Sequence, residues 1–237
     1  MKNIIIFILA IITYAQAAKA TGLSADQIVK KVDDIRNPSE SYIMKVEVVS
    51  TDQQKSVFDV AIRGNDKTLI KTIEPSRDRG RNLLMLDEDM WAYIPNLGRA
   101  VRISLNQKLS GQAANGDISR MRWSGDYDAK IAQEDASVLN QWVIMLSANK
   151  KGLTYEKIKA WVDKKNFHPI RVEFMTPAGK ILKKATYGNY RELAGKIRPN
   201  EIAIEDAVRP SDRSVIRILS MEVKELPASL FNQNNLK

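Results

Sequence analysis

Residues 83–95 read LLMLDEDMWAYIP: two short apolar runs flank the acidic triplet 87–89. Two such runs joined by turn-forming residues predict a β-hairpin. Both arms are apolar at almost every position rather than at alternate ones. A strand with two apolar faces is covered on both sides or lines a cavity. The pattern leaves open which member of each alternating pair points inward.

Alternating apolar and polar residues on either side of this hairpin predict further strands. Met44, Val46 and Val48 alternate with Lys45 and Glu47, and the same period recurs through most of the chain. With the hairpin arms, these segments give roughly ten or eleven antiparallel strands. The other expected strands lie at 44–48, 58–63, 67–73, 141–146, 157–162, 170–174, 181–190, 197–205 and 215–223, and a short run at 100–103 continues the hairpin after the turn at 96–98.

Three segments depart from the strand pattern. Residues 25–36 follow Ser24, a good N-cap, and place apolar residues at helical spacing, so we expect an amphipathic helix that ends before Pro38. Residues 104–135 are rich in Gly, Asn and Ser and predict a long loop with one or two helical turns. Residues 226–231 predict a docked terminal turn. One curved antiparallel sheet, with the helix and loop over a face, is the expected architecture.

The first 20 residues have the anatomy of a cleavable secretory signal. A positive start at Met1-Lys2 precedes an apolar run at 4–12, and small residues precede possible cleavage after Ala17 or Ala20. The run is shorter than the ~20 residues that span a bilayer, which makes an uncleaved anchor the weaker alternative. We therefore expect a periplasmic protein whose mature part, residues 21–237, is a single domain.

The composition indicates which classes of binding partner to expect. Formal net charge is +9, from 37 basic and 28 acidic residues. A basic exported protein favours acidic partners such as anionic headgroups, although solvated strand faces explain basic residues equally well. Nucleic acid is not an expected partner in the periplasm. The chain has no cysteine and so no disulfide.

Catalytic and metal chemistry find little support. The single histidine, His168, precedes Pro169 at a strand start, which leaves neither a zinc ligand set nor a robust catalytic triad. The carboxylates at 87–89 are expected in a solvated hairpin turn, and Asp126 and Asp128 in another. We expect no enzyme activity, no cofactor and no metal.

Several motifs are similar to those of a known family. They include Gly116-Asp117-Ile118, Lys159-Ala160-Trp161-Val162-Asp163, His168-Pro169-Ile170 and Pro227-Ala228-Ser229-Leu230-Phe231, together with the hairpin above. This order resembles the outer membrane lipoprotein-sorting proteins, relatives of the carrier LolA. The resemblance implies a half-open antiparallel barrel whose concave face is capped by helices. It departs in the loop, where 116–119 and 125–128 replace the family's usual Gly-Ser-Asp-Phe and Tyr-Glu-Asp runs.

On this reading the protein binds a lipid or lipoprotein acyl chain in an apolar cavity and shuttles it between inner-membrane machinery and the outer membrane. An inner-membrane exporter and an outer-membrane receptor are the possible partners. The alternative is a non-enzymatic envelope sensor or interaction module that binds lipid or an acidic protein.

Candidate site residues follow from both lines of reasoning. Arginines expected at the rim, to meet a headgroup, a protein partner or only solvent, are Arg77, Arg79, Arg81 and Arg99. Residues expected to line the apolar cavity are Ile28, Val32, Ile35, Leu84, Leu86, Trp91, Tyr93, Ile103, Met121 and Trp123. Met121 and Trp123 are read either as part of an adaptable lid or as a loop anchored by one buried tryptophan.

Overall fold

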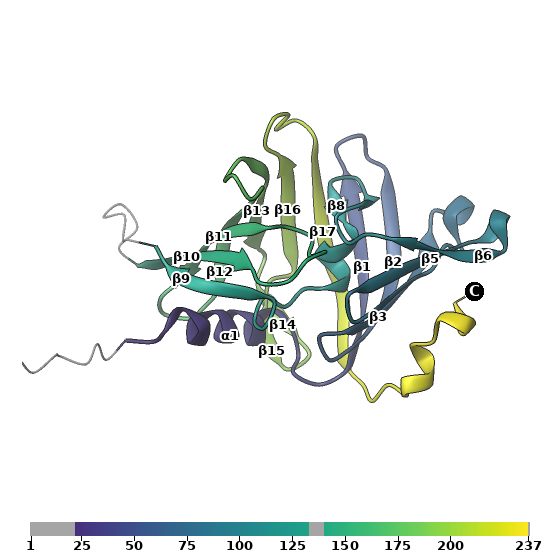
Figure 1. The fold of residues 1–237 in the computed structure, drawn as a ribbon, viewed down its shortest axis with the longest axis horizontal. Helices are drawn as coiled ribbons and strands as arrows, with labels where there is room; N and C mark the ends of the chain where they lie inside the picture. Colours follow the sequence, from purple (N-terminus) through teal and green to yellow (C-terminus); the bar gives the residue numbers. More distant parts are fainter. Residues whose placement is uncertain (1–21, 133–139, 237) are drawn as a thin grey trace, which may run out of the picture.

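A computed structural model describes residues 22–132 and 140–236. The predicted signal, residues 1–20, lies outside them. In the described part, one antiparallel sheet of 13 strands has the order β6-β5-β4-β3-β2-β1-β17-β16-β13-β12-β11-β10-β9, with β6 and β9 as its two edges (Figure 1). The sheet is curved and not closed, as a half-open barrel requires, so the predicted fold class is confirmed.

The strands have the following bounds. They are β1 Tyr42–Ser50, β2 Lys55–Arg63, β3 Lys67–Glu74, β4 Leu83–Leu86, β5 Asp89–Ile94, β6 Arg99–Ile103, β7 Lys108–Ser110, β8 Ala113–Ala114, β9 Tyr127–Ile131, β10 Gln141–Ala148, β11 Lys157–Asp163, β12 Pro169–Met175, β13 Ile181–Gly188, β14 Arg191–Leu193, β15 Lys196–Arg198, β16 Glu201–Asp206 and β17 Arg213–Val223. The helices are α1 Ala25–Arg36 and α2 Asn115–Ser119, with short three-ten helices η1 Ser76–Asp78, η2 Pro95–Leu97, η4 Ala228–Leu230 and η5 Gln233–Asn235.

The first helix has the predicted bounds. Ser24 caps α1 by accepting a hydrogen bond from the Gln27 N–H, and the Gln27 side chain accepts one from the Ser24 N–H. This reciprocal pair satisfies two backbone donors that a helix start otherwise leaves free. At the other end, the extended backbone of Asn37 and the following Pro38 stop the helix.

The region predicted as a loop is a packed layer. Residues 104–126, here called the crossing segment, contain the β7–β8 hairpin and α2 and pass in front of the central strands (Figure 1). Leu105, Ala113 and Ile118 of this segment are buried in the main core. Gly116 permits the close packing, because a Cβ there would lie 1.7 Å from Thr154 Oγ1. Strand β9, also within the expected loop, extends the sheet edge.

The two faces of the sheet carry different cores. The inner face holds the main core, in which Ile158, Ile204 and Ile216 pack with α1 and the crossing segment. On the outer face of β3–β6, a second cluster joins Leu84 to Leu226 and Phe231 of the C-terminal segment, residues 224–236. The predicted docked terminal turn is thus present. The apolar hairpin β4–β5 is covered on both sides, which is one of the two alternatives that its sequence left open.

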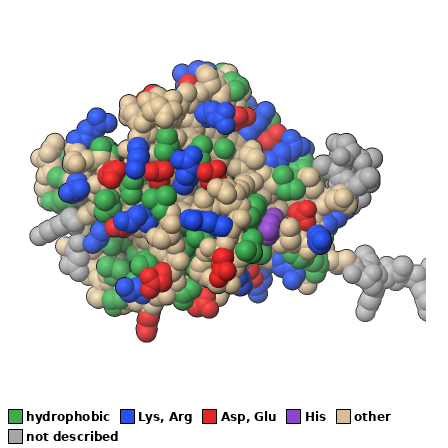
Figure 2. All heavy atoms as spheres, turned by 180° about the vertical axis from the view of Figure 1, so that it is seen from behind, with side chains coloured by type: hydrophobic (Ala, Val, Ile, Leu, Met, Phe, Trp, Pro, Cys, Tyr) green, Lys and Arg blue, Asp and Glu red, His purple; other side chains and the backbone are tan. Residues whose placement is uncertain are grey.

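Elsewhere the outer face is a ladder of alternating charge. Register places Lys159, Glu173, Lys184, Glu205 and Arg213 opposite one another on consecutive strands. Figure 2 shows acidic and basic side chains interleaved on the side of the molecule seen from behind. Opposite charges paired across strands favour this arrangement. Many of the basic residues therefore belong to solvated strand faces, one of the two readings of the composition.

Candidate functional site

The interior of the half-barrel is roofed by two elements. Helix α1 lies below one half of the sheet and contacts β9 and β15, while the crossing segment covers the central strands (Figure 1). Apolar residues of both, among them Ile28 and Val32 of α1 and Met121 and Trp123 of the crossing segment, pack into the inner-face core. We call α1 and the crossing segment together the lid.

A buried carboxylate joins the two parts of the lid. Asp33 on α1 accepts hydrogen bonds from the Trp123 N–H at 2.9 Å and from the Ser124 N–H and hydroxyl at 2.7 Å each. Its side chain is fully buried. Burial raises the pKa of Asp33, while the Arg36 cation and the donors on Ser124 and Trp123 oppose that rise. We call this set of bonds the latch.

Arg36 strengthens the same junction. Its guanidinium lies 3.9 Å from the centre of the Trp123 ring and 3.5 Å from the Asp33 carboxylate, and it donates to the Met121 carbonyl. A cation over an indole face in a desolvated setting is attractive by about 2 kcal/mol. The loop tryptophan is therefore held from both its backbone and its ring.

A second arginine fixes the end of α1 to the hairpin β14–β15. Arg198 is almost fully buried and donates to the carbonyls of Asp34 at 3.0 Å, Ile35 at 2.9 Å and Leu193 at 2.9 Å. The carbonyls of a last helical turn have no partner within the helix and carry partial negative charge. Arg198 gives these carbonyls both hydrogen-bond donors and a nearby positive charge. Burial lowers its pKa, and the nearby Tyr42 opposes this.

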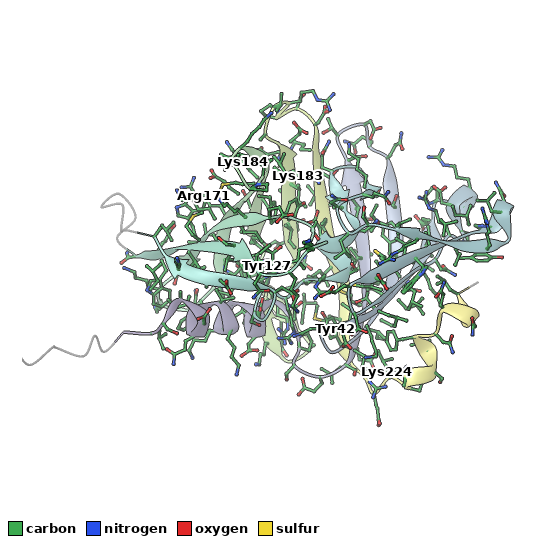
Figure 3. The ribbon with its side chains drawn as sticks, in the orientation of Figure 1. Tyr42, Tyr127, Arg171, Lys183, Lys184 and Lys224 are labelled. Atoms are coloured by element: carbon green, nitrogen blue, oxygen red, sulfur yellow. The ribbon has the colours of Figure 1, made fainter. Side chains whose placement is uncertain are left out.

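A further polar group lies under α2. The Asp117 carboxylate accepts from the Ala114 N–H at 2.8 Å and the Tyr155 hydroxyl at 3.1 Å. Burial raises its pKa, opposed by the Lys183 cation. Lys183, on β13, donates to the Gln112 carbonyl at 2.6 Å, and burial lowers its pKa (Figure 3). These bonds pin the crossing segment to the sheet.

The interior beneath the lid is filled. A void of about 40 Å³ lies there, bordered by Arg36, Asp117, Trp123, Tyr155 and Tyr187 among others. Such a space holds a water molecule or two but no acyl chain. In this conformation the lid's own side chains occupy the concave face, so the ligand-sized apolar cavity stays a prediction.

The ten predicted cavity residues do not share one surface. Those on the inner face are Ile28, Val32, Ile103, Met121 and Trp123, whereas Ile35 is only half-buried. Those on the outer face, near or under the C-terminal segment, are Leu84, Leu86, Trp91 and Tyr93. In β4 and β5 the inward residues are instead Leu83, Met85, Met90 and Ala92. Period-two alternation separates the two sets without saying which one faces the interior.

The predicted rim arginines gather at one end of the sheet. Arg77 lies in η1, Arg79 and Arg81 follow η1, Arg99 follows η2, and all four are exposed. A Cβ added at Gly80 would lie 3.5 Å from the Pro95 side chain, so the two turns lie close together. Arg81 also borders a small hollow of about 60 Å³ between the crossing segment and the inner face of β2–β4.

Two other expectations concern acidic residues and His168. Asp126 is wrongly predicted as solvated: it is buried and forms ion pairs with Arg120 at 2.5 Å and Lys150 at 3.0 Å. Burial opposes its ionisation, but the hydrogen bonds and charge of Arg120 lower its pKa overall.

His168 stacks on Tyr190 with ring centres 4.0 Å apart. Within the described ranges no three His, Cys, Asp or Glu side chains form a metal-binding group.

Sequence reasoning missed Asp33, Arg36 and Arg198. For the two helix residues a signal existed, since positions 29, 32, 33 and 36 share one helical face, so both charges lie on the apolar side of α1. For Arg198 there was none, because its two partners on α1, the carbonyls of Asp34 and Ile35, lie more than 160 residues away in the chain.

The fold and site define a class: a half-open β-barrel with a latched lid over its inner face. Comparison with known proteins agrees. A LolA superfamily protein, NE2245 from Nitrosomonas europaea, is 30% identical with a TM-score of 0.82, and the match covers 90% of this chain and 99% of that one. The chain belongs to the LolA superfamily, and the predicted family resemblance is confirmed.

Other matches are more distant. A family model described as "Uncharacterized protein" matches residues 64–237. A putative outer membrane lipoprotein-sorting protein domain from Vibrio parahaemolyticus shares the fold at 21% identity and TM-score 0.73, over 90% of this chain and 97% of that one. A DUF1329 family protein from Desulfovibrio piger shares it at 19% identity and TM-score 0.73, over 90% and 98%. No curated protein sequence matches the chain. No helix among the described residues is long and apolar enough to span a membrane.

Proposed function

We propose that this protein is a periplasmic carrier that takes up a lipid or lipoprotein acyl chain under its lid and performs no chemistry on it. The observation that carries the proposal is the construction of the lid. Its two parts are tied together by polar bonds at Asp33 rather than by apolar packing alone. Water can replace such bonds once the lid moves, so opening costs less than breaking an equal apolar contact.

Opening would present an apolar inner surface. Beneath the lid lie four isoleucines of the inner face: Ile158 of β11, Ile202 and Ile204 of β16, and Ile216 of β17. The closed form we describe is then the empty state, in which the lid's own residues Ile28, Val32, Met121 and Trp123 take the place of cargo. A carrier that shields its apolar face when empty avoids aggregation.

The energetics suit a shuttle rather than a store. Each buried methylene gains about 0.8 kcal/mol relative to water, so two 16-carbon chains gain roughly 25 kcal/mol in gross terms. A bilayer offers the same shelter, so the carrier competes only with the membrane. A lid that refills the cavity supplies part of the free energy of release.

The arginine-rich end is the proposed place of handover. Arg81 borders the hollow between the crossing segment and β2–β4, where Phe58 and Leu83 of the inner-face core lie. Guanidinium groups there suit an anionic headgroup or the acidic surface of an exporter or receptor. In this proposal Arg77, Arg79 and Arg99 meet the partner, and Arg81 guides the head as the chain enters.

A second candidate, an envelope interaction module without cargo, is favoured by one observation: the void at Asp117, Trp123 and Tyr155 beneath the lid has a volume of only about 40 Å³. Such a module would use the same basic end to bind an acidic protein. It would have no need of an opening lid.

A disulfide-locked lid separates the two. Asp33 and Ser124 are in direct side-chain contact, and the chain has no native cysteine, so the pair Asp33→Cys with Ser124→Cys introduces a single crosslink. The mature protein is purified from bacterial periplasm without detergent, and bound lipid is identified by mass spectrometry. We expect co-purified acyl lipid in the wild type, loss of it in the oxidised variant, and recovery after reduction. A lipid-free wild type that also refuses lipid from vesicles would overturn the carrier proposal.

A further inference from the structure

A large hollow lies on the outer face, away from the lid. It has a volume of about 440 Å³ and runs across β17, β1, β2 and β3 beside the C-terminal segment. Its floor is the cross-strand row Ile43, Ala61 and Leu69, and Leu230 of η4 forms a wall. We call it the outer groove. Its size falls within the range of small-molecule sites, about 300 to 1,000 Å³.

Small side chains create the groove. Ala61 lies between the larger Ile43 and Leu69, and Ser220 lies opposite Lys45 on β17. The C-terminal segment covers the apolar residues Leu69, Leu84 and Trp91 from one side but stops short of filling this space. The result is an apolar trough bounded below by the sheet and at one side by Leu230.

The two ends of the outer groove carry opposite charges. Along the second cross-strand row, Lys45 and Asp59 form an ion pair at 3.4 Å, and Lys71 stands next to Asp59. Lys71 makes no ion pair among the described residues, so it is the surplus cation at the β3 end. Glu222 lies at the β17 end, three strand spacings or about 14 Å away.

We propose that the outer groove binds the chain of a single-chain anionic amphiphile such as a fatty acid. The methylenes lie on Ile43, Ala61 and Leu69 against Leu230, and the carboxylate is near Lys71. A head at the opposite end would meet Glu222 and be repelled. This site is separate from the lidded interior, from which the sheet itself divides it.

The test uses a dansylated undecanoic acid as probe, measured by fluorescence titration on the full mature chain. Ala61→Phe fills the trough, and we expect at least a tenfold loss of affinity. Ala203→Phe makes the same change on the outer face of β16, within the charge ladder, and should leave binding unchanged. Lys71→Glu should weaken the probe about tenfold but leave its methyl ester unaffected.

The locked lid separates this site from the interior. In the oxidised Asp33→Cys, Ser124→Cys variant the interior is closed, and we expect the probe to bind with unchanged affinity. Binding that is lost on locking, or that survives Ala61→Phe, would place the probe elsewhere and overturn the inference. Because Lys71→Glu changes only an exposed side chain, a folding failure of Ala61→Phe would not leave the question open.

Discussion

The latch predicts that Asp33→Ala opens the lid without unfolding the barrel. In the closed form the substitution removes the acceptor of three donors: the Trp123 N–H, the Ser124 N–H and the Ser124 hydroxyl. A buried donor without a partner costs about 1–3 kcal/mol. It also leaves the buried Arg36 without its carboxylate. Relief of the desolvated Asp33 charge offsets part of this, so the closed lid should lose about 3 kcal/mol.

In the open form water satisfies the same groups, so the loss falls on the closed state alone. A change of about 3 kcal/mol corresponds to a rise of roughly a hundredfold in the open population. Hydrogen exchange reports it directly: amides of residues 121–124 should exchange about a hundred times faster, while amides of the central strands β1 and β17 keep their protection.

The neighbouring residue supplies a matched control. Asp34 is on the same helix turn, but its carboxylate is 44% exposed and lies 3.8 Å from Arg122. A weak exposed pair contributes at most about 1 kcal/mol, so Asp34→Ala should change exchange little. Equal acceleration in the two variants would refute the latch. So would equal acceleration of lid and sheet amides in Asp33→Ala, which would indicate global unfolding.

Three further outcomes follow from the structure. Burial lowers the pKa of His168, because the folded state favours the neutral imidazole. The contribution of this residue to the free energy of unfolding is therefore fully present above pH 6.5 and is lost as the pH falls through the lowered pKa. NMR titration of this single imidazole should give a pKa under 6.5, and a higher value would contradict its burial. Gly116→Ala should lower the free energy of unfolding in urea by about 1–3 kcal/mol, because the added Cβ would collide with Thr154. Gly188→Ala adds a Cβ that has nothing within 4 Å and should lower it much less. Phe231→Ala should destabilise docking of the C-terminal segment by about 3 kcal/mol and expose it to limited proteolysis; a tail that remains protected would exclude Phe231 as its anchor.

Local patterns in the sequence predict most of the regular elements, although β7, β8 and β9 lie within the segment predicted as a loop. Capping at Ser24 and helical spacing set the bounds of α1, because both depend on residues within one or two turns. Period-two alternation located most strands, and the doubly apolar runs at 83–86 and 90–94 required cover on two sides. These signals are local, and the physics that produces them is local as well.

Which face of the sheet is the interior, and which side chains fill it, depends on contacts between segments far apart in the chain. Alternation places Leu83 and Leu84 on opposite faces of the sheet but does not say which face points inward. Strands and a C-terminal segment far along the chain decide that. The burial of Asp33 and Arg198 is likewise a matter of distant partners, since a charge enters a core only where donors or acceptors from other segments meet it. Whether a void remains depends on the summed volumes of side chains that converge from the whole barrel, and no stretch of sequence carries that sum.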